Sequence, residues 1–465
     1  MPHRQPQVTR RNFMKGGALG AAALSLPAWF VEETLAQSPA PRPSAANDRP
    51  GIALIGCGGQ GTNDAKLASR FGDVVAICDV DDHHVADAAL EFPKAKRHRD
   101  FRDAVAQKDV DVVVVGTPDH WHTLVNIHAM RQGKDVYSEK PLTLTIDEGK
   151  HLVEVARQTK RVFQTGSQQR SSREFRLACE VVRNGRIGKL RHVLVGLPAG
   201  PRGGPIEKQP VPEWLNWDLW QGQAPAVDYV PQRCHGSFRY WYEYSEGTIT
   251  DWGAHHFDIA HWGLGADRGG PLSVFGRELS DYIVDGYTTP SDFFIEYEYP
   301  NDVRLSCVST RNGEGAGHMW RGRRRGAGGA PAEEPPRVEA RQRKGNLENG
   351  VWFEGADGWV FVTRGRVEAS GPEILNDPLP PGAERLYASD DHMGNFFECV
   401  KSRKQPICEA EIGHRSVSAA HLGAISIRLG RKLKWDPAKE QFVGDAEADK
   451  MLSREMREPW GYDAV

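Results

Sequence analysis

Three features are scarce in this sequence of 465 residues: long apolar runs, an excess of charge of one sign, and closely spaced cysteines. The uncharged run over residues 16–31 falls short of the roughly 20 residues that a membrane-spanning helix needs. With 59 Lys plus Arg against 62 Asp plus Glu, no positive field exists to hold nucleic acid. The seven cysteines include no C-x-x-C pair, so we expect neither a disulfide framework nor a bound metal. A soluble globular chain remains, long enough for two domains.

The first 49 residues resemble an export address rather than part of a domain. Arg10 and Arg11 lie in a basic segment that precedes the uncharged run, in the order of a twin-arginine signal. The small residue Ala36 marks a point where a signal peptidase could cut. We therefore predict a signal peptide over 1–36, a linker over 37–49, and a periplasmic or otherwise exported protein that uses the twin-arginine machinery. The alternatives are a disordered basic N-terminus and an uncleaved membrane anchor.

A strand followed by a glycine turn opens the next segment. The apolar run over 51–56 leads into Gly-Cys-Gly-Gly-Gln-Gly, followed by a predicted helix over 62–71 and a second apolar strand over 73–78. In such a βαβ unit the glycines let the backbone approach a pyrophosphate, and an acidic residue after the second strand binds the ribose hydroxyls. A carboxylate there repels a ribose phosphate, so NAD is favoured over NADP. The candidate cofactor-binding residues of this unit are Gly56, Gly58, Gly59, Gln60, Gly61 and Asp79.

Two further predicted strands place polar residues at the same edge of the sheet. The strand over 109–116 is followed by Thr-Pro-Asp-His-Trp-His at 117–122, and the strand over 135–138 by Glu-Lys-Pro. Ligands of open parallel sheets bind at the carboxyl ends of the strands. A lysine at this position would face the nicotinamide end of the cofactor. The cofactor-binding candidates added here are Thr117, Pro118, His122, Glu139 and Lys140.

Taken in this order, the glycine turn, the motif at 117–122 and Glu-Lys-Pro at 139–141 resemble the Gfo/Idh/MocA family of oxidoreductases. The resemblance implies a Rossmann domain over 50–165 that binds NAD(H). It also implies that Lys140 contacts the substrate hydroxyl and the nicotinamide ribose. The residues themselves leave other interpretations open: an incidental glycine turn, a solvated charge at Lys140, and a buried structural histidine at His122.

From residue 166 onward the pattern changes to longer, alternating runs, which predict a mostly antiparallel sheet. These runs are 190–197, 292–299, 303–310, 351–354 and 359–367. The predicted fold class is therefore α/β, with a parallel, doubly wound Rossmann domain and a C-terminal α+β substrate domain over 166–465. A stretch rich in Gly, Pro and Arg at 312–345 is interpreted as a flexible insertion. We also expect a helical segment over 391–433 and a homo-oligomer formed through the C-terminal sheet.

The segment 246–262 carries most of the candidate chemistry of this half. A helix entered near Asp251 would place Asp251 and His255 on one face, and the resembled family has a catalytic aspartate and histidine at this spacing. Oxidation of a hydroxyl group requires a base, and the ordinary pKa of histidine is near neutrality. We take His255 as the base, Asp251 as the group that orients the imidazole or holds a neighbouring hydroxyl, and Lys140 as the group that stabilises the alkoxide. Lysine as the base, a metal site and a structural cluster remain the alternatives.

Two other sets of residues are candidates for contact with the substrate. Gln168 and Arg170 qualify by their position after a predicted strand. Aromatic side chains gather in the segment 234–244 and could stack on sugar rings, or belong to the core or to a subunit contact. The nearby tryptophans are Trp214, Trp217 and Trp220.

These patterns predict an NAD(H)-dependent oxidoreductase that acts on a CH–OH group of a sugar, glycoside or cyclic polyol. The alternative is an NAD-dependent enzyme that cleaves glycosides by transient oxidation and elimination. A cofactor-binding protein without activity is disfavoured because every proposed catalytic position is filled. An exported enzyme has no assured supply of free nicotinamide cofactor, so we expect NAD(H) to be tightly bound, with the linker near residues 38–47 covering the adenine end.

Overall fold

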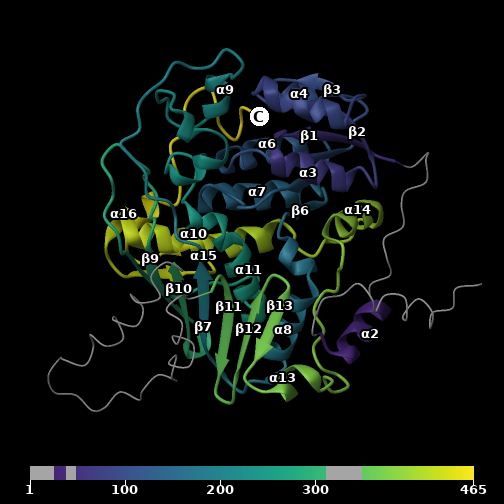
Figure 1. The fold of residues 1–465 in the computed structure, drawn as a ribbon, viewed down its shortest axis with the longest axis vertical. Helices are drawn as coiled ribbons and strands as arrows, with labels where there is room; N and C mark the ends of the chain where they lie inside the picture. Colours follow the sequence, from purple (N-terminus) through teal and green to yellow (C-terminus); the bar gives the residue numbers. More distant parts are fainter. Residues whose placement is uncertain (1–25, 38–48, 310–347) are drawn as a thin grey trace, which may run out of the picture.

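The computed structural model describes residues 26–37, 49–309 and 348–465 (Figure 1). The predicted insertion at 312–345 and most of the predicted linker therefore lie outside the described residues. Two sheets organise the chain, and in Figure 1 the parallel sheet lies above the larger mixed sheet. Within the described part of the chain, no helix has both the length and the apolar character required to cross a membrane.

The first sheet has six parallel strands in the order 3-2-1-4-5-6. From edge to edge these are β3 Lys96–His98, β2 Asp73–Cys78, β1 Gly51–Ile55, β4 Val112–Val115, β5 Asp135–Ser138 and β6 Phe163–Thr165. Strands β1 and β4 are buried along their whole length, as continuous apolar runs in a covered parallel sheet should be. The strand order reverses between β1 and β4, which opens a crevice for a ligand at the carboxyl edge. The prediction of a Rossmann domain is confirmed.

Helices cover both faces of this sheet. They are α3 Gly59–Ala68, α4 Asp82–Glu91, α5 Phe101–Val105, α6 Asp119–Arg131 and α7 Ile146–Thr159. Helix α3 begins at Gly59, three residues before the predicted start at Thr62, because the glycine turn itself supplies its first turn. The amino end of α3 consequently lies directly at the ligand crevice.

The second sheet has nine strands, and β7 and β10 form its one parallel pair between named strands. From edge to edge the strands are β13 Arg366–Ala369, β12 Trp359–Thr363, β11 Gly350–Gly355, β7 Leu190–Leu197, β10 Val303–Ser309, β9 Phe293–Tyr299, β8 Ser273–Glu278, β14 Leu433–Asp436 and β15 Gln441–Phe442. The prediction of a mostly antiparallel sheet is confirmed. One predicted strand, 359–367, is in fact two strands, because Gly365 adopts a positive φ of 74° and turns the chain back.

Helices lie between the two sheets and against the second one. The longer ones are α8 Arg173–Arg183, α11 Gly253–Leu264, α14 His392–Ser402 and α15 Ala410–Leu429. Shorter ones are α2 Ala28–Gln37, α10 Thr248–Asp251, α13 Pro372–Asn376 and α16 Ala446–Lys450. The short helix α9 Trp217–Gln221 lies beside the Rossmann domain, near α4 in Figure 1. The predicted helical segment at 391–433 thus contains two helices and the start of a strand. Figure 1 shows α15 crossing between the sheets, where it contacts α7 on one side and β8 on the other.

The chain returns to the Rossmann domain after building the second sheet. The ring of Phe397 in α14 stacks on Phe71 with centroids 5.2 Å apart. Near the C-terminus, Trp460 meets Trp121 edge to face at 4.8 Å. Segments that follow the predicted boundary at residue 166 therefore pack against the Rossmann domain. These contacts hold the second domain against the Rossmann domain.

Candidate active site

The glycine turn has the backbone geometry that a bound pyrophosphate needs. Gly56 adopts a positive φ of 89°, which side chains other than glycine rarely tolerate. A Cβ added at Gly61 would lie 2.0 Å from the carbonyl oxygen of Gly56, so only glycine lets α3 pack this close to β1. Gly58 caps α3 without a side chain, which leaves the first N–H groups of the helix available to an anion.

A cavity of about 280 Å³ extends along the carboxyl edge of the parallel sheet. It passes from Asp79 after β2, over the glycine turn, to Thr117 and Pro118 after β4. The predicted residues that line it are Gly56, Gly58, Gly59, Gln60, Asp79, Thr117 and Pro118. Its shape, its glycine floor and its acidic end fit a dinucleotide such as NAD.

Asp79 is held rigidly at one end of this cavity. Its Oδ2 accepts a hydrogen bond from the Cys57 N–H at 2.7 Å, and its Oδ1 accepts one from the Asp81 N–H at 3.0 Å. Arg99 also lines the cavity, but its guanidinium is paired with Asp82. The carboxylate therefore presents a fixed negative charge where the ribose of a dinucleotide would lie.

A segment of the second domain closes over this acidic end. Residues 214–241, the strap, place the Trp214 carbonyl 3.0 Å from the Asp82 N–H and stack the Trp214 ring on His83 at 4.7 Å. The His235 imidazole lies 3.3 Å from the carboxylate of Asp81. His235 lines the cavity together with Phe238 and Arg239 of the same segment. The strap thus joins the two domains across the adenosine end of the cavity.

Asp81, His84 and His235 could also place one ligand atom each within 4.8 Å of one another, the spacing of a metal site. Two of these three residues, Asp81 and His84, have other interaction partners. Asp81 Oδ1 accepts hydrogen bonds from the N–H groups of His83 and His84 as the cap of α4. The His84 ring lies 3.4 Å from Asp79, and this contact raises its pKa. We interpret the group as the polar wall of the cofactor cavity.

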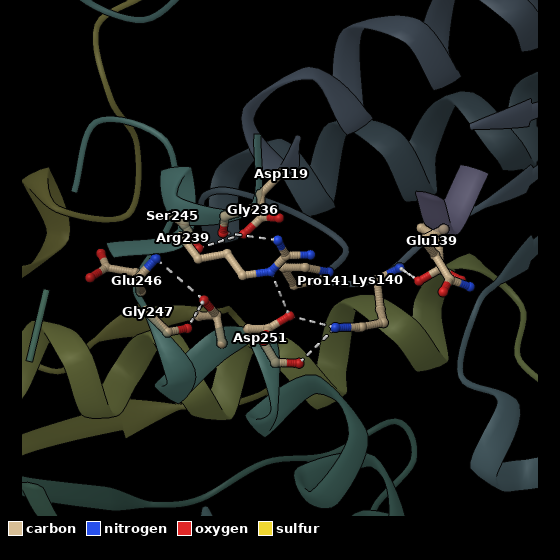
Figure 2. A network of polar contacts seen from close by, with 12 residues as sticks. Asp119, Glu139, Lys140, Pro141, Gly236, Arg239, Ser245, Glu246, Gly247 and Asp251 are labelled. Carbon is tan, nitrogen blue, oxygen red and sulfur yellow. Dashed lines mark hydrogen bonds and ion pairs between the residues drawn. The ribbon is translucent and has the colours of Figure 1, made fainter. Parts of the chain in front are cut away.

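Lys140, Asp251 and Arg239 form the charged centre of the site (Figure 2). Lys140 Nζ donates to Asp251 Oδ1 at 2.6 Å and to the Asp251 carbonyl at 3.1 Å. Arg239 Nε donates to the same carboxylate oxygen at 3.0 Å. Burial alone would raise the pKa of Asp251, but the two cations outweigh it, and the pKa is lowered. Because Arg239 also lines the cavity, it connects the Lys140–Asp251 pair to the cofactor side of the site.

Asp119 lies beside this centre and is fully buried. Ser245 Oγ donates to its Oδ2 at 2.6 Å. Burial raises its pKa to about 6, although Arg239 and Ser245 partly oppose the shift. Figure 2 shows Asp119 on the opposite side of Arg239 from Lys140. The site therefore contains a lysine and an arginine that share one carboxylate, and beside them a carboxyl group whose pKa burial raises to about 6.

The buried Asp119 predicts a pH-dependent contribution to stability. A raised pKa means that the folded protein holds this proton more tightly than the unfolded chain between about pH 4 and pH 6. Stability contributed by the group is present at low pH and is lost as the pH rises through this range, by about 3 kcal/mol. We expect the unfolding free energy of wild type, relative to Asp119→Asn, to fall by about 2 kcal/mol of this total between pH 4 and pH 7 in urea titrations. A difference that stays constant with pH would contradict the raised pKa.

His255 differs from its predicted setting. The chain does not form one continuous helix here, because α10 ends at Asp251, α11 begins at Gly253, and Trp252 caps the break. The carboxylate of Asp251 bonds Lys140 and Arg239, and no described hydrogen bond joins it to His255. The prediction that Asp251 orients the imidazole is therefore corrected. Burial, followed by the nearby charge of Lys140, holds the pKa of His255 well below its ordinary value, so the ring is neutral at physiological pH.

The His255 ring has no hydrogen-bond partner among the described residues, and its Nδ1 is buried. Buried polar atoms are rarely left without a partner in folded proteins. An imidazole in this state suits contact with a ligand. The other histidines of α11 are occupied: His256 faces Asn349 at 2.8 Å and His261 faces Tyr299 at 2.7 Å. They belong to the core.

Three predicted site residues hold neighbouring parts of the site in place without lining the cavity: Glu139, Gln168 and His122. Glu139 accepts a hydrogen bond from Gln168 Nε2 at 2.6 Å, which fixes the residue next to Lys140. His122 is buried, with its ring nitrogens 2.8 Å and 3.0 Å from the carbonyls of Pro141 and Thr117. These contacts hold the ends of β4 and β5 together. None of the three is among the residues that line the cavity.

Arg170 is not placed to bind a substrate. Its side chain is 2% exposed and pairs with Asp258 at 2.8 Å and with Asp267 at 2.7 Å. The guanidinium also lies over the Trp262 ring at 5.1 Å. With its charge matched inside the core, Arg170 fastens α11 to the segment after β6. The position-based prediction of substrate contact is corrected.

Most aromatic side chains near the strap form a core of their own. Trp217, Trp220, Trp241 and Tyr244 are each 7% exposed or less. Trp217 and Trp220 stack at 4.9 Å, so they are occupied by one another rather than by a ligand. Trp220 still reaches the cavity wall. The aromatic cluster thus forms the interior of the strap, and of these four residues only Trp220 lines the cavity.

Arg239 is the main functional residue that sequence reasoning missed. It lies in the aromatic segment 234–244, which we had considered only for its rings. A basic residue within a buried aromatic run is unusual, because a charge there requires a partner. That signal was present, but the partner, Asp251, could not be identified without the fold.

Comparison with known proteins relates this chain to sugar-active proteins. It is 28% identical over 207 residues to a glycosyl hydrolase family 109 protein of Shewanella pealeana, covering 40% of this chain and 45% of the relative. It is 27% identical over 206 residues to an α-N-acetylgalactosaminidase of Shewanella oneidensis, with the same two coverages of 40% and 45%. The chain thus spans less than half the length of the curated relatives it matches.

Solved structures share the fold over most of the chain. A levoglucosan dehydrogenase in complex with NADH and levoglucosan superposes with a TM-score of 0.58 at 15% identity, over 83% of this chain and 99% of that one. The WlbA dehydrogenase of Bordetella pertussis, in complex with NADH and UDP-GlcNAcA, gives a TM-score of 0.58 at 17% identity, over 83% and 99%. At such identities the likeness concerns the fold.

Three family models match the sequence itself. A twin-arginine translocation signal matches residues 7–27, which confirms the predicted type of export signal. The NAD-binding Rossmann fold of an oxidoreductase family matches residues 51–167. The C-terminal alpha/beta domain of the same family matches residues 203–283 and 345–462. Together with the dinucleotide cavity and the Lys140 site, these matches show that the chain belongs to the Gfo/Idh/MocA family of oxidoreductases.

Proposed function

We propose that this protein is an NAD(H)-dependent oxidoreductase that acts on a CH–OH group of a sugar, glycoside or cyclic polyol. The observation that carries the proposal is the hydrogen-bonded chain from Lys140 through Asp251 to Arg239, which ends on the wall of the dinucleotide cavity. A cationic group held beside a nicotinamide site is what oxidation of an alcohol requires, because negative charge develops on the substrate oxygen.

The residues divide the chemistry among them. NAD, when bound, supplies the acceptor for the hydride that leaves the substrate carbon. Lys140 stabilises the oxygen as its proton departs, and Asp251 keeps the ammonium group in place. His255 is neutral, and its buried Nδ1 has no hydrogen-bond partner among the described residues, so the ring can accept that proton or a hydrogen bond from the hydroxyl group. In the reverse direction the same groups return the proton to the oxygen of the ketone.

The low pKa of His255 changes one expectation about the reaction. A base with an ordinary histidine pKa would impose a pH dependence near neutrality, which a substitution of His255 would remove. Burial places this ionisation below neutrality. Any loss of activity through protonation of His255 is therefore expected on the acid side of the profile, and lysine remains the second candidate for the base.

Asp79 is proposed to select NAD over NADP. In Asp79→Ala the fixed negative charge at the ribose end is lost, while Arg99 and His84 remain on the cavity wall. We expect the preference for NAD, measured as the ratio of the two kcat/KM values, to fall by about a hundredfold, equivalent to about 3 kcal/mol. Asp87→Ala, which removes an exposed carboxylate of α4 that does not line the cavity, is the control. An unchanged ratio would place the ribose elsewhere.

We further propose that NAD(H) stays bound through the catalytic cycle. The strap covers the adenosine end of the cavity, whereas the linker over 38–47 that the sequence suggested for this role lies outside the described residues. Protein purified without added cofactor and then denatured should release close to one equivalent of NAD(H). Trp214→Ala, which removes the stacking on His83, should speed cofactor loss by at least about tenfold. Cofactor-free wild type that turns over only with millimolar NAD would contradict retention.

Transient oxidation that leads to glycoside cleavage is the second candidate function. Its support is the likeness to proteins described as glycosyl hydrolase family 109 members. Retained cofactor suits this cycle, because the hydride returns to the sugar from which it came. Incubation with aryl glycosides separates the two: a net dehydrogenase changes the absorbance of the cofactor, whereas a glycosidase releases the aryl group with no net change. A protein that does neither with a broad panel of glycosides and polyols would overturn both proposals.

The remaining proposals concern location and assembly. A twin-arginine signal at residues 7–27 supports export, and we propose the periplasm as the destination. We also propose a homo-oligomer that forms through the nine-stranded C-terminal sheet. Cell fractionation tests the first and light scattering tests the second.

A further inference from the structure

Helix α2 is part of the folded protein although it precedes the Rossmann domain in the sequence. Phe30 is 1% exposed and belongs to the main hydrophobic core, together with Phe175 of α8. Thr34 is fully buried, and the Arg176 side chain donates a hydrogen bond to its hydroxyl group. Figure 1 shows α2 lying at the side of the second domain near α8 and α13. The side of α2 that carries Phe30 and Thr34 is therefore packed against the second domain.

Polar contacts fix the same helix at three further points. Glu33 accepts two hydrogen bonds from Arg385, each 3.0 Å long. The Trp29 indole N–H donates to the Leu375 carbonyl at 3.1 Å. The Arg176 guanidinium lies over the Phe30 ring at 4.5 Å. These partners come from α8, α13 and the segment before α14, so α2 joins three parts of the second domain.

This docking conflicts with the cleavage point suggested by the sequence. The match to the twin-arginine signal ends at residue 27, and α2 begins at Ala28. A cut after Ala36 would remove nearly the whole helix and would expose the apolar surface under Phe30. Signal peptidases act on extended segments, whereas Ala36 belongs to a helix that packs on the domain. The twin-arginine pathway carries folded proteins, so α2 is docked when the peptidase meets the chain.

We propose that the exported protein retains α2 as a structural arm of the second domain, and that any cleavage of the signal falls before Ala28. Residues that would otherwise be removed with the signal peptide then remain as part of the mature fold. The inference is independent of the proposed reaction, because none of these contacts involves the cofactor cavity or Lys140.

Intact-mass measurement of the exported full chain tests the inference directly. The protein is produced with a C-terminal tag in a host with a twin-arginine pathway, and the periplasmic and membrane fractions are both analysed. We expect every mature species to begin at or before Ala28, including an uncleaved chain in the membrane fraction. A species that begins at Gln37 and makes up most of the exported protein would overturn the proposal.

Limited proteolysis of the same full chain tests the docking itself. Phe30→Ala should raise the rate of chymotrypsin cleavage at Trp29 by at least about tenfold, because removal of a buried aromatic ring favours the undocked helix. Glu32→Ala changes an exposed residue of the same helix and serves as the matched control, with wild-type cleavage expected. Cleavage at Trp29 that is equally fast in wild type and Phe30→Ala would show that the helix is not docked, and would overturn the inference.

Discussion

Lys140→Met is expected to lower kcat by about a thousandfold or more, in line with the loss of a charged group that stabilises an oxyanion. The ammonium nitrogen lies 2.6 Å from Asp251 Oδ1 and the Lys140 side chain is 12% exposed, so little solvent can compensate for the lost charge. Methionine fills a similar volume without charge or hydrogen-bond donors. Because Lys140 is not among the residues that line the cavity, we expect the protein to retain bound NAD(H) at the wild-type level. Single-turnover rates and released cofactor are the two measurements.

The matched control for this substitution is Lys66→Met. Lys66 belongs to α3 and forms an exposed ion pair with Glu91, so its loss should leave both measurements unchanged. If Lys140→Met turned over at a rate near that of wild type, Lys140 would have no part in the mechanism. If it lost cofactor together with activity, the lysine would serve binding rather than the chemical step.

The Rossmann half could be predicted from the sequence because its signals are local. Continuous apolar strands, a glycine turn and an acidic residue after the second strand each occupy a few adjacent residues, and together they specify the crevice. Gly56 and Asp79, which such local signals mark as cofactor-binding candidates, line the cavity on the sheet side. The strap was not predicted, because a loop that closes over another domain has no periodic pattern in its sequence.

The catalytic half could be predicted only in part because its contacts are distant in sequence. A spacing of four residues suggested that Asp251 and His255 share a helical face, but the helix breaks at Trp252 and Asp251 turns toward Lys140. Arg170 looked like a pocket residue by position, whereas it is buried in the core and pairs with the buried Asp258 and the half-buried Asp267. Whether a charge serves binding or structure depends on its partner, and the partner is set by tertiary packing.

The centre of the site predicts that Arg239 is a positioning residue for the reaction. Asp251 Oδ1 accepts hydrogen bonds from both Arg239 and Lys140, so the arginine fixes the carboxylate that in turn holds the lysine. Arg239→Gln should leave Asp251 free to rotate and lower kcat by about a hundredfold. Arg239→Lys keeps the positive charge without the planar guanidinium group and should recover part of this loss.

A pH profile separates positioning from a general loss of structure. The two cations lower the pKa of Asp251 against the effect of burial, so removal of Arg239 must raise it. The activity of Arg239→Gln should therefore fall at a higher pH on the acid side than that of wild type, because the protonated carboxyl group no longer holds Lys140. Arg233→Gln is the matched control: Arg233 belongs to the same strap but pairs with Glu243 over the Trp241 ring, away from Asp251. Its profile should keep the wild-type midpoint. An acid limb that stays in place in Arg239→Gln would mean that Arg239 acts only on the shape of the cavity, and that Lys140 and Asp251 hold one another without help.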